Sequence, residues 1–96
     1  MNKGERAHTF DAAARMIKAV AHPARIEIID LLGQTSKLSV NELKEKLGIT
    51  QSMTSQHLAQ LRNAGVLGCS REANTRYYYV LNKNVFKLLN CIRNCS

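Results

Sequence analysis

Signals for the end of one helix and the start of the next lie close together in the middle of this chain. Ser39 and Glu42 have the spacing of a capping box, in which each side chain accepts a hydrogen bond from the other residue's backbone amide. Gly48 is suited to end the helix that follows, and Thr50 is suited to cap the next one, which runs to about Ala64. The segment therefore predicts two short helices joined by a tight turn.

The second of these helices is unusual because its first two turns carry mostly small polar residues. The apolar spacing predicts a core-facing side made of Leu43, Leu47, Ile49, Thr54, His57, Leu58 and Leu61. The opposite side of the second helix then carries Gln51, Ser52, Ser55 and Gln56. Helix, glycine turn and helix form the layout of a helix-turn-helix, whose second helix enters the DNA major groove by its N-terminus.

The rest of the chain predicts three more helices and a β-hairpin. The alanine-rich residues 9–21 favour a helix, and Pro23 begins a central helix that we expect to end near Gly33. Two short segments rich in β-forming residues flank the turn at 73–74, and Asn82 is suited to cap a last helix. The predicted fold is mainly α with a small β-hairpin, in the order α-α-α-α-β-β-α of a winged helix-turn-helix.

Length and charge favour a single nucleic-acid-binding domain over residues 1–96. Fourteen Lys and Arg against seven Asp and Glu give a net charge of +7, which favours anionic partners such as nucleic acid. The apolar runs are too short to span a membrane, and the first residues do not form a secretory signal. No glycine-rich phosphate loop, H-E-x-x-H motif or nucleophile beside a base is present, so we expect no enzymatic activity.

The polar helix face and the hairpin predict an interface with double-stranded DNA. Hydroxyl and amide side chains hydrogen-bond to phosphates and base edges, and helix N-termini attract phosphate. Arginines at the tip of the hairpin would meet the DNA backbone or the minor groove. We predict DNA contacts from Thr50, Gln51, Ser52, Ser55, Gln56, Arg62, Arg71 and Arg76. An alternative is a winged helix that contacts only proteins, in which these residues are ordinary exposed positions.

Three segments together resemble the arsenical-resistance repressor (ArsR/SmtB) family: KAVAHPARIEIIDLL, SVNELKEKLGITQSMTSQHLAQLRNAGVL and TRYYYVL. The similarity covers roughly residues 13–89. It implies a cytoplasmic, homodimeric bacterial or archaeal repressor that binds an inverted-repeat operator. It also implies that the first and last helices, about 9–21 and 83–95, form the dimer interface. The apolar stripe of the last helix would be buried there, through Val85, Leu88, Leu89 and Ile92.

Many members of that family release DNA when a metal binds, and the resemblance allows their ligand positions to be compared. The thiol ligands of the arsenic and cadmium sensors correspond to Ser39 and Asn41, and the Asp and His of the zinc sensors correspond to Asn82 and Asn84. Neither Ser39 nor Asn41 carries a thiol, and the neutral amides of Asn82 and Asn84 are poor substitutes for carboxylate and imidazole. We therefore expect no metal or cofactor at either position, and the sequence does not identify the inducer.

The cysteines and histidines are the remaining candidates for chemistry. Cys91 and Cys95 lie one turn apart on the predicted last helix, so an alternative function is a thiol- or metal-responsive repressor that uses this pair. The interpretation that we favour is that they are idle thiols near a chain end. Cys69 is expected to pack on the first strand of the hairpin. Of the histidines, we expect His57 to be half-buried, His22 to start a helix and His8 to be exposed.

Overall fold

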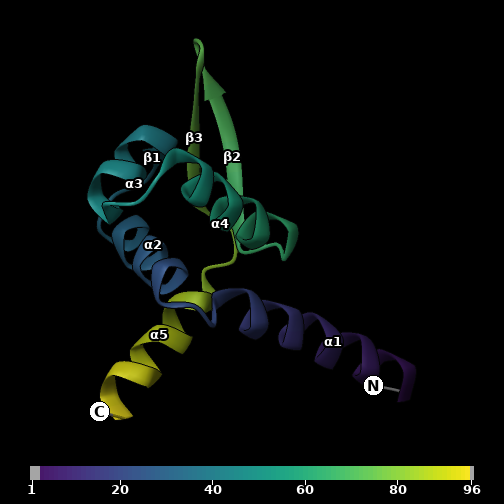
Figure 1. The fold of residues 1–96 in the computed structure, drawn as a ribbon. Helices are drawn as coiled ribbons and strands as arrows, with labels where there is room; N and C mark the ends of the chain where they lie inside the picture. The colour runs from purple at the N-terminus through teal and green to yellow at the C-terminus, as the bar shows by residue number, and fades with distance from the viewer. Residues whose placement is uncertain (1–2, 96) are drawn as a thin grey trace.

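The computed structural model describes residues 3–95, with side chains for residues 9–94. Five helices and a three-stranded antiparallel sheet make up the described chain (Figure 1). In chain order the elements are α1 (Lys3–Val20), α2 (Pro23–Gln34), β1 (Leu38–Ser39), α3 (Val40–Leu47), α4 (Gln51–Asn63), β2 (Leu67–Glu72), β3 (Thr75–Val80) and α5 (Asn84–Cys95). The predicted winged helix-turn-helix is confirmed, with one strand in addition to the predicted hairpin.

The capping signals act as the sequence predicts. Ser39 and Glu42 form the complete capping box of α3, with Ser39 N donating to Glu42 Oε1 and Glu42 N donating to Ser39 Oγ. These hydrogen bonds hold the pKa of Glu42 below its ordinary value. Gly48 ends α3 at φ 68°, a left-handed conformation that favours glycine. Thr50 caps α4 by accepting a hydrogen bond from Met53 N. The turn between α3 and α4 is therefore fixed by local chemistry.

Several element boundaries differ from the prediction. Helix α1 begins at Lys3 rather than near residue 9, and α2 continues past Gly33 to Gln34. Helix α5 begins at Asn84, where the backbone amide donates to the side chain of Asn82. Strand β1 was not predicted. Its two residues form a strand only because they pair with β3, and two residues are too few to show an alternating pattern.

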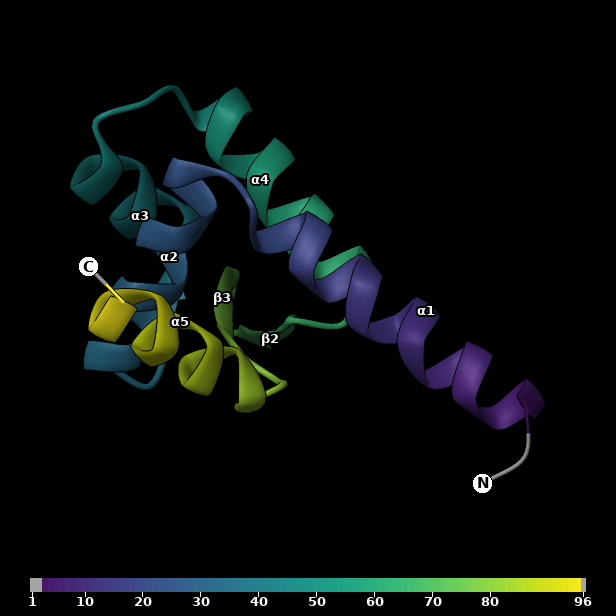
Figure 2. The same ribbon diagram turned by 90° about the horizontal axis from the view of Figure 1, so that it is seen from below.

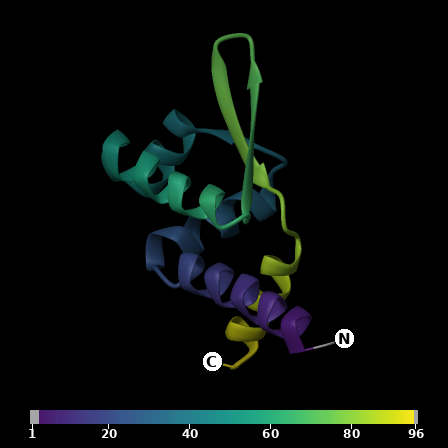
Figure 3. The same ribbon diagram turned by 90° about the vertical axis from the view of Figure 1, so that its right-hand side faces the viewer.

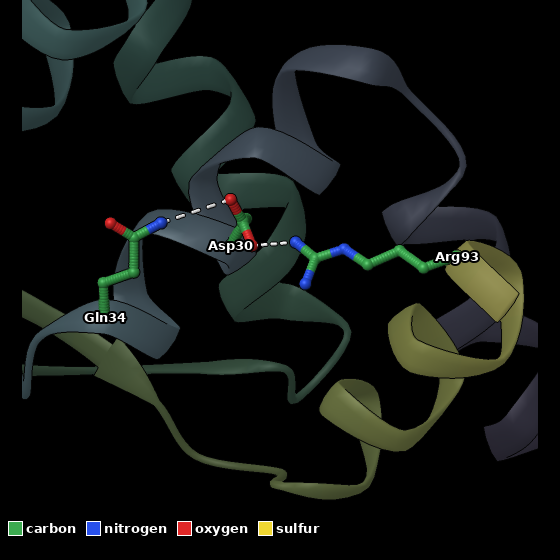
Figure 4. Close-up of polar contacts among 3 residues, drawn as sticks. All are labelled: Asp30, Gln34 and Arg93. Atoms are coloured by element: carbon green, nitrogen blue, oxygen red, sulfur yellow. Dashed lines mark hydrogen bonds and ion pairs between the residues drawn. The ribbon is translucent and has the colours of Figure 1, made fainter.

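One hydrophobic core joins all the helices to the sheet. Ile28, Ile29 and Leu32 of α2 lie at its centre, and Val85 and Leu89 of α5 are buried in the same cluster. Close packing continues at Gly33 of α2, where an added Cβ would lie 3.1 Å from a ring carbon of Phe86. An ion pair between Asp30 and Arg93 also joins α2 to α5, and Gln34 donates to the other oxygen of Asp30 (Figure 4).

The hairpin and the terminal helices lie at opposite ends of the molecule. Strands β2 and β3 project beyond the helices, while α1 and α5 lie at the end away from the hairpin tip (Figures 1 and 3). The first part of α1 extends past the other elements, and its last turns lie beside α4 (Figure 2). No helix of the described residues is long and apolar enough to cross a membrane.

Candidate nucleic-acid interface

One side of α4 anchors the helix in the core. Thr54, Leu58 and Leu61 are fully buried, as the apolar spacing predicts, and His57 on the same side is 7% exposed. The Thr54 hydroxyl donates to Thr50 O at 2.8 Å, so the buried threonine has a hydrogen-bond partner. These contacts fix the rotation of α4 about its own axis. Its polar side must then face outward.

The outward side of α4 presents the residues that the sequence predicts. The side chains of Gln51, Ser52, Ser55 and Gln56 are all exposed. The first hydrogen bond within the helix runs from Thr54 N to Thr50 O. The backbone amides of Gln51 and Ser52 precede it and point out of the helix start, where an anion is favoured. The first two turns of α4 therefore offer hydrogen-bonding groups that need a partner outside the chain.

The hairpin places two arginines directly opposite each other. Arg71 and Arg76 are cross-strand partners next to the turn, and both are exposed. Like charges at such a pair destabilise the hairpin unless an anion lies near them. The one carboxylate of the hairpin, Glu72, forms an ion pair with Lys37. Lys37 also lies over the ring of Tyr77, 4.8 Å from its centroid. The hairpin tip therefore carries a net positive charge.

A hollow of about 240 Å³ lies between the hairpin and the helix-turn-helix. Arg76 and Gln51 line it, and both were predicted as DNA-contacting residues. Five further residues line it that were not predicted as DNA contacts: Ser39, Val40, Asn41, Asn74 and Thr75. Asn41 belongs to the first turn of α3, which the sequence indicates only as a helix start. The structure therefore brings the starts of α3 and α4 together with the hairpin tip.

A polar network connects α4 to the first two helices. Arg25 of α2 donates from Nε to His57 Nδ1 at 3.1 Å and from Nη1 to Ala19 O of α1 at 3.1 Å. His57 is thus more buried than predicted. His22 caps α2 as predicted, and its ring centroid lies 4.6 Å from that of His57. Burial, and then the neighbouring His22 and Arg25, lower the pKa of His57 below its ordinary value. The neutral ring accepts through Nδ1 and carries its proton on Nε2.

The remaining predicted residues are dispersed over the molecule. Arg62 is exposed near the C-terminal end of α4, and Thr50 caps the same helix. Cys69 is half-buried against the core, and Cys91 is exposed. The side chains of Cys95 and His8 lie outside the described residues. Among the described side chains, no group of three or more His, Cys, Asp and Glu is arranged to hold a metal ion.

The predicted dimer stripe is only partly available to a partner. Val85 and Leu89 are 0% and 6% exposed within the chain itself, so they have almost no surface left to bury. Leu88 is half-buried, whereas Ile92 is 53% exposed. The sequence analysis did not single out Phe10 and Ile17, which are 68% and 51% exposed on α1. Their seven-residue spacing, which places both on one side of a helix, was the available signal.

Comparison with known proteins gives a family match across the helix-turn-helix. The profile described as "Bacterial regulatory protein, arsR family" matches residues 22–67. The transcriptional activator HlyU of Vibrio cholerae is 38% identical over 78 residues, which are 81% of this chain and 71% of HlyU. The biofilm growth-associated repressor of Agrobacterium fabrum is 37% identical over 79 residues, which are 82% of this chain and 67% of that protein.

Solved structures match almost the whole chain. The crystal structure of NolR from Sinorhizobium fredii has a TM-score of 0.84 at 32% identity and covers 99% of this chain and 94% of its own. The homodimeric winged helix-turn-helix DNA-binding domain of a possible ArsR-family regulator from Mycobacterium bovis has a TM-score of 0.86 at 26% identity. That match covers 98% of this chain and 86% of the Mycobacterium bovis domain.

Proposed function

The chain belongs to the ArsR family of bacterial regulatory proteins, and from this premise we propose that it is a homodimeric repressor that binds an inverted-repeat DNA operator. The observation that carries the proposal is the exposed polar start of α4 beside the Arg71–Arg76 pair of the hairpin. Hydrogen-bonding side chains on a helix N-terminus suit base edges and phosphates, and arginines on an adjacent wing suit the DNA backbone.

The terminal helices support the dimer. Phe10 and Ile17 of α1 and Ile92 of α5 are large apolar side chains with more than half of their surface exposed. Both helices lie at the end of the molecule away from the hairpin tip (Figure 3). A second copy that covers these side chains would leave both α4 helices and both hairpins free. Two-fold symmetry then matches an operator made of two inverted half-sites.

Repression rather than activation is the direction that we propose. A dimer that covers a promoter represses it simply by excluding the transcription machinery. The neutral residues at 39, 41, 82 and 84 make the proposed repressor independent of a metal at those positions. Expression of a reporter gene placed behind the operator should rise when the protein is removed. A fall in that expression would indicate an activator.

The direct test is binding to the DNA upstream of the protein's own gene. Fluorescence anisotropy with that duplex and with a scrambled duplex of equal length should show tighter binding to the first. Affinity should fall steeply with salt, because bound Lys and Arg release counterions from the phosphates. Equal, weak binding to both duplexes would favour the alternative winged helix that contacts only proteins.

A further inference from the structure

A cleft that carries several cations lies at the end of α4 away from the hairpin tip. The cleft, of about 350 Å³, opens between the last turns of α1 and the last turns of α4. Three cations line it, Arg15 and Lys18 of α1 and Arg25 of α2, together with the amides Gln60 and Asn63 of α4. Ala19 and Ala64 complete its wall. Its volume lies within the range of small-molecule sites.

The charge of this cleft is not balanced by the described side chains. No carboxylate lines it, and within residues 9–94 neither Arg15 nor Lys18 forms an ion pair. Asp11 lies one turn before Arg15 and lines an adjoining hollow with Arg15 and Lys18. One carboxylate near three cations leaves a local excess of positive charge. Such an excess at a concave surface attracts a multiply charged anion.

One of the three cations is held in place before any ligand arrives. Arg25 is half-buried, and its hydrogen bonds to His57 and to Ala19 O fix the plane of its guanidinium. A guanidinium held in this way loses little conformational freedom on binding an oxyanion. Arg15 and Lys18, three residues apart on one side of α1, can close over the anion from the adjacent wall.

The position of the cleft separates it from the proposed DNA interface. Gln51, which lines the hollow at the hairpin, and Asn63, which lines this cleft, begin and end α4. Twelve helical steps place them about 18 Å apart along the axis. The cleft also lies on a different side of α1 from Phe10 and Ile17, because Lys18 and Ile17 are consecutive residues and point about 100° apart. Arg62, the predicted DNA contact near this end of α4, does not line the cleft, so neither the operator nor the dimer proposed above needs to fill it.

From these observations we infer that the cleft between α1 and α4 binds a small, multiply charged oxyanion, such as a phosphorylated or polycarboxylate metabolite. The cations bind its charged oxygens, and Gln60 and Asn63 donate to the rest of the molecule. Because the ligand would contact both α1 and α4, its binding would couple the dimer helix to the recognition helix. That consequence for the operator rests on the proposed function, whereas the binding site itself does not.

The test is calorimetric titration of the full chain, without DNA, at constant ionic strength. Pyrophosphate and citrate serve as probes for the two classes of oxyanion. Arg15→Gln and Lys18→Gln should each weaken binding about tenfold or more, since each removes a charged contact. Lys87→Gln, which removes one exposed charge from α5, is the matched control and should bind as the wild type does. Saturable binding of either probe with this pattern supports the site and identifies its class.

Two outcomes would overturn the inference. The first is no saturable binding of either probe up to about 10 mM, or equal binding by all three variants, which would indicate only a general response to net charge. The second is a flatter salt dependence of operator binding in Lys18→Gln but not in Lys87→Gln. This would mean that the cleft contacts DNA phosphates. The titration contains no DNA, so it tests anion binding at the cleft even if the proposed repressor function is wrong.

Discussion

At the scale of single residues, Ser55 and Gln56 carry most of the proposed sequence readout. Both are exposed on the second turn of α4, and the buried Thr54 and His57 on either side of them in sequence fix their direction. Gln pairs with adenine through two hydrogen bonds, and Ser can form a hydrogen bond with any of several bases. Rigid placement matters because a base contact is lost when its side chain rotates away.

We predict that the double variant Ser55→Ala, Gln56→Ala loses specific operator binding while the protein stays folded. Each base contact contributes about 1–3 kcal/mol, so the loss of two should weaken operator binding at least about tenfold. Affinity for scrambled DNA should change little. Anisotropy with both duplexes measures the effect, and Asn90→Ala on the exposed side of α5 is the control. Unchanged operator affinity would exclude both residues from the site.

His57 provides a second residue-scale prediction, through its pH dependence. Its pKa is lowered in the folded chain, so between that pKa and the ordinary value near 6.5 the unfolded chain binds more protons. The free energy of unfolding should therefore fall as the pH drops below about 6.5, by at most about 1.4 kcal/mol per pH unit from this group. Urea unfolding at several pH values would measure the slope.

His57→Gln should remove this contribution, because the amide oxygen still accepts from Arg25 but does not titrate in this range. The imidazole signals of His57, followed by NMR in the wild type, should show protonation at a pH below that of an unfolded peptide. An identical slope in the wild type and in His57→Gln would assign the pH dependence to other groups.

Local chemistry explains which residues the sequence could identify. Ser39, Gly48 and Thr50 were predicted correctly because capping depends on neighbours within a few residues. The contact between Arg25 and His57 joins residues 32 positions apart, and no local pattern encodes it. The arginine that contacts the buried side of α4 therefore could not be identified before the folded structure was known.

At the scale of elements, the hairpin acts as a charged arm attached to the core at its base. Leu67 and Val80 pair at that base and are buried, whereas Arg71 and Arg76 pair near the tip and are exposed. Burial decreases from the base of the hairpin to its tip, which the β-forming residues that predicted the hairpin do not show by themselves. Strand β1 escaped prediction because its pairing with β3 is non-local. The start of α1 escaped because its first residues lack an apolar stripe.

We predict that Arg71→Ala and Arg76→Ala weaken binding to operator and scrambled DNA alike. An arginine on a phosphate adds affinity with little sequence information. The slope of log affinity against log salt should flatten by about one per lost contact, or about two for a symmetric dimer. Lys87→Ala, with the same charge change on α5, should leave the slope unchanged. A loss confined to the operator would instead mean that the arginine reads bases or groove shape.

At the scale of the whole molecule, the terminal helices carry large apolar side chains that the single chain leaves exposed. Phe10 and Ile17 share one side of α1, whereas Met16, Ala19 and Val20 of the same helix pack against the core. Dimerisation through the terminal helices stays a prediction, but two of its four stripe residues, Val85 and Leu89, are already buried in the single chain. Val85 and Leu89 face α2 because α5 folds back across the core, which apolar spacing alone does not show.

We therefore predict that Ile17→Asp or Ile92→Asp dissociates the dimer without unfolding the chain. Burying an isoleucine side chain contributes about 1.5–3 kcal/mol to dimerisation. In a symmetric dimer the substitution removes this contribution from both protomers. At about 3 kcal/mol or more, the dimer dissociation constant should rise at least about 100-fold. Sedimentation velocity would show monomers, while circular dichroism would still show the native helix content. Met53→Asp, which changes a similarly exposed residue of α4, should remain dimeric because α4 faces the DNA. Dimers that persist with aspartate at both 17 and 92 would place the interface on another surface.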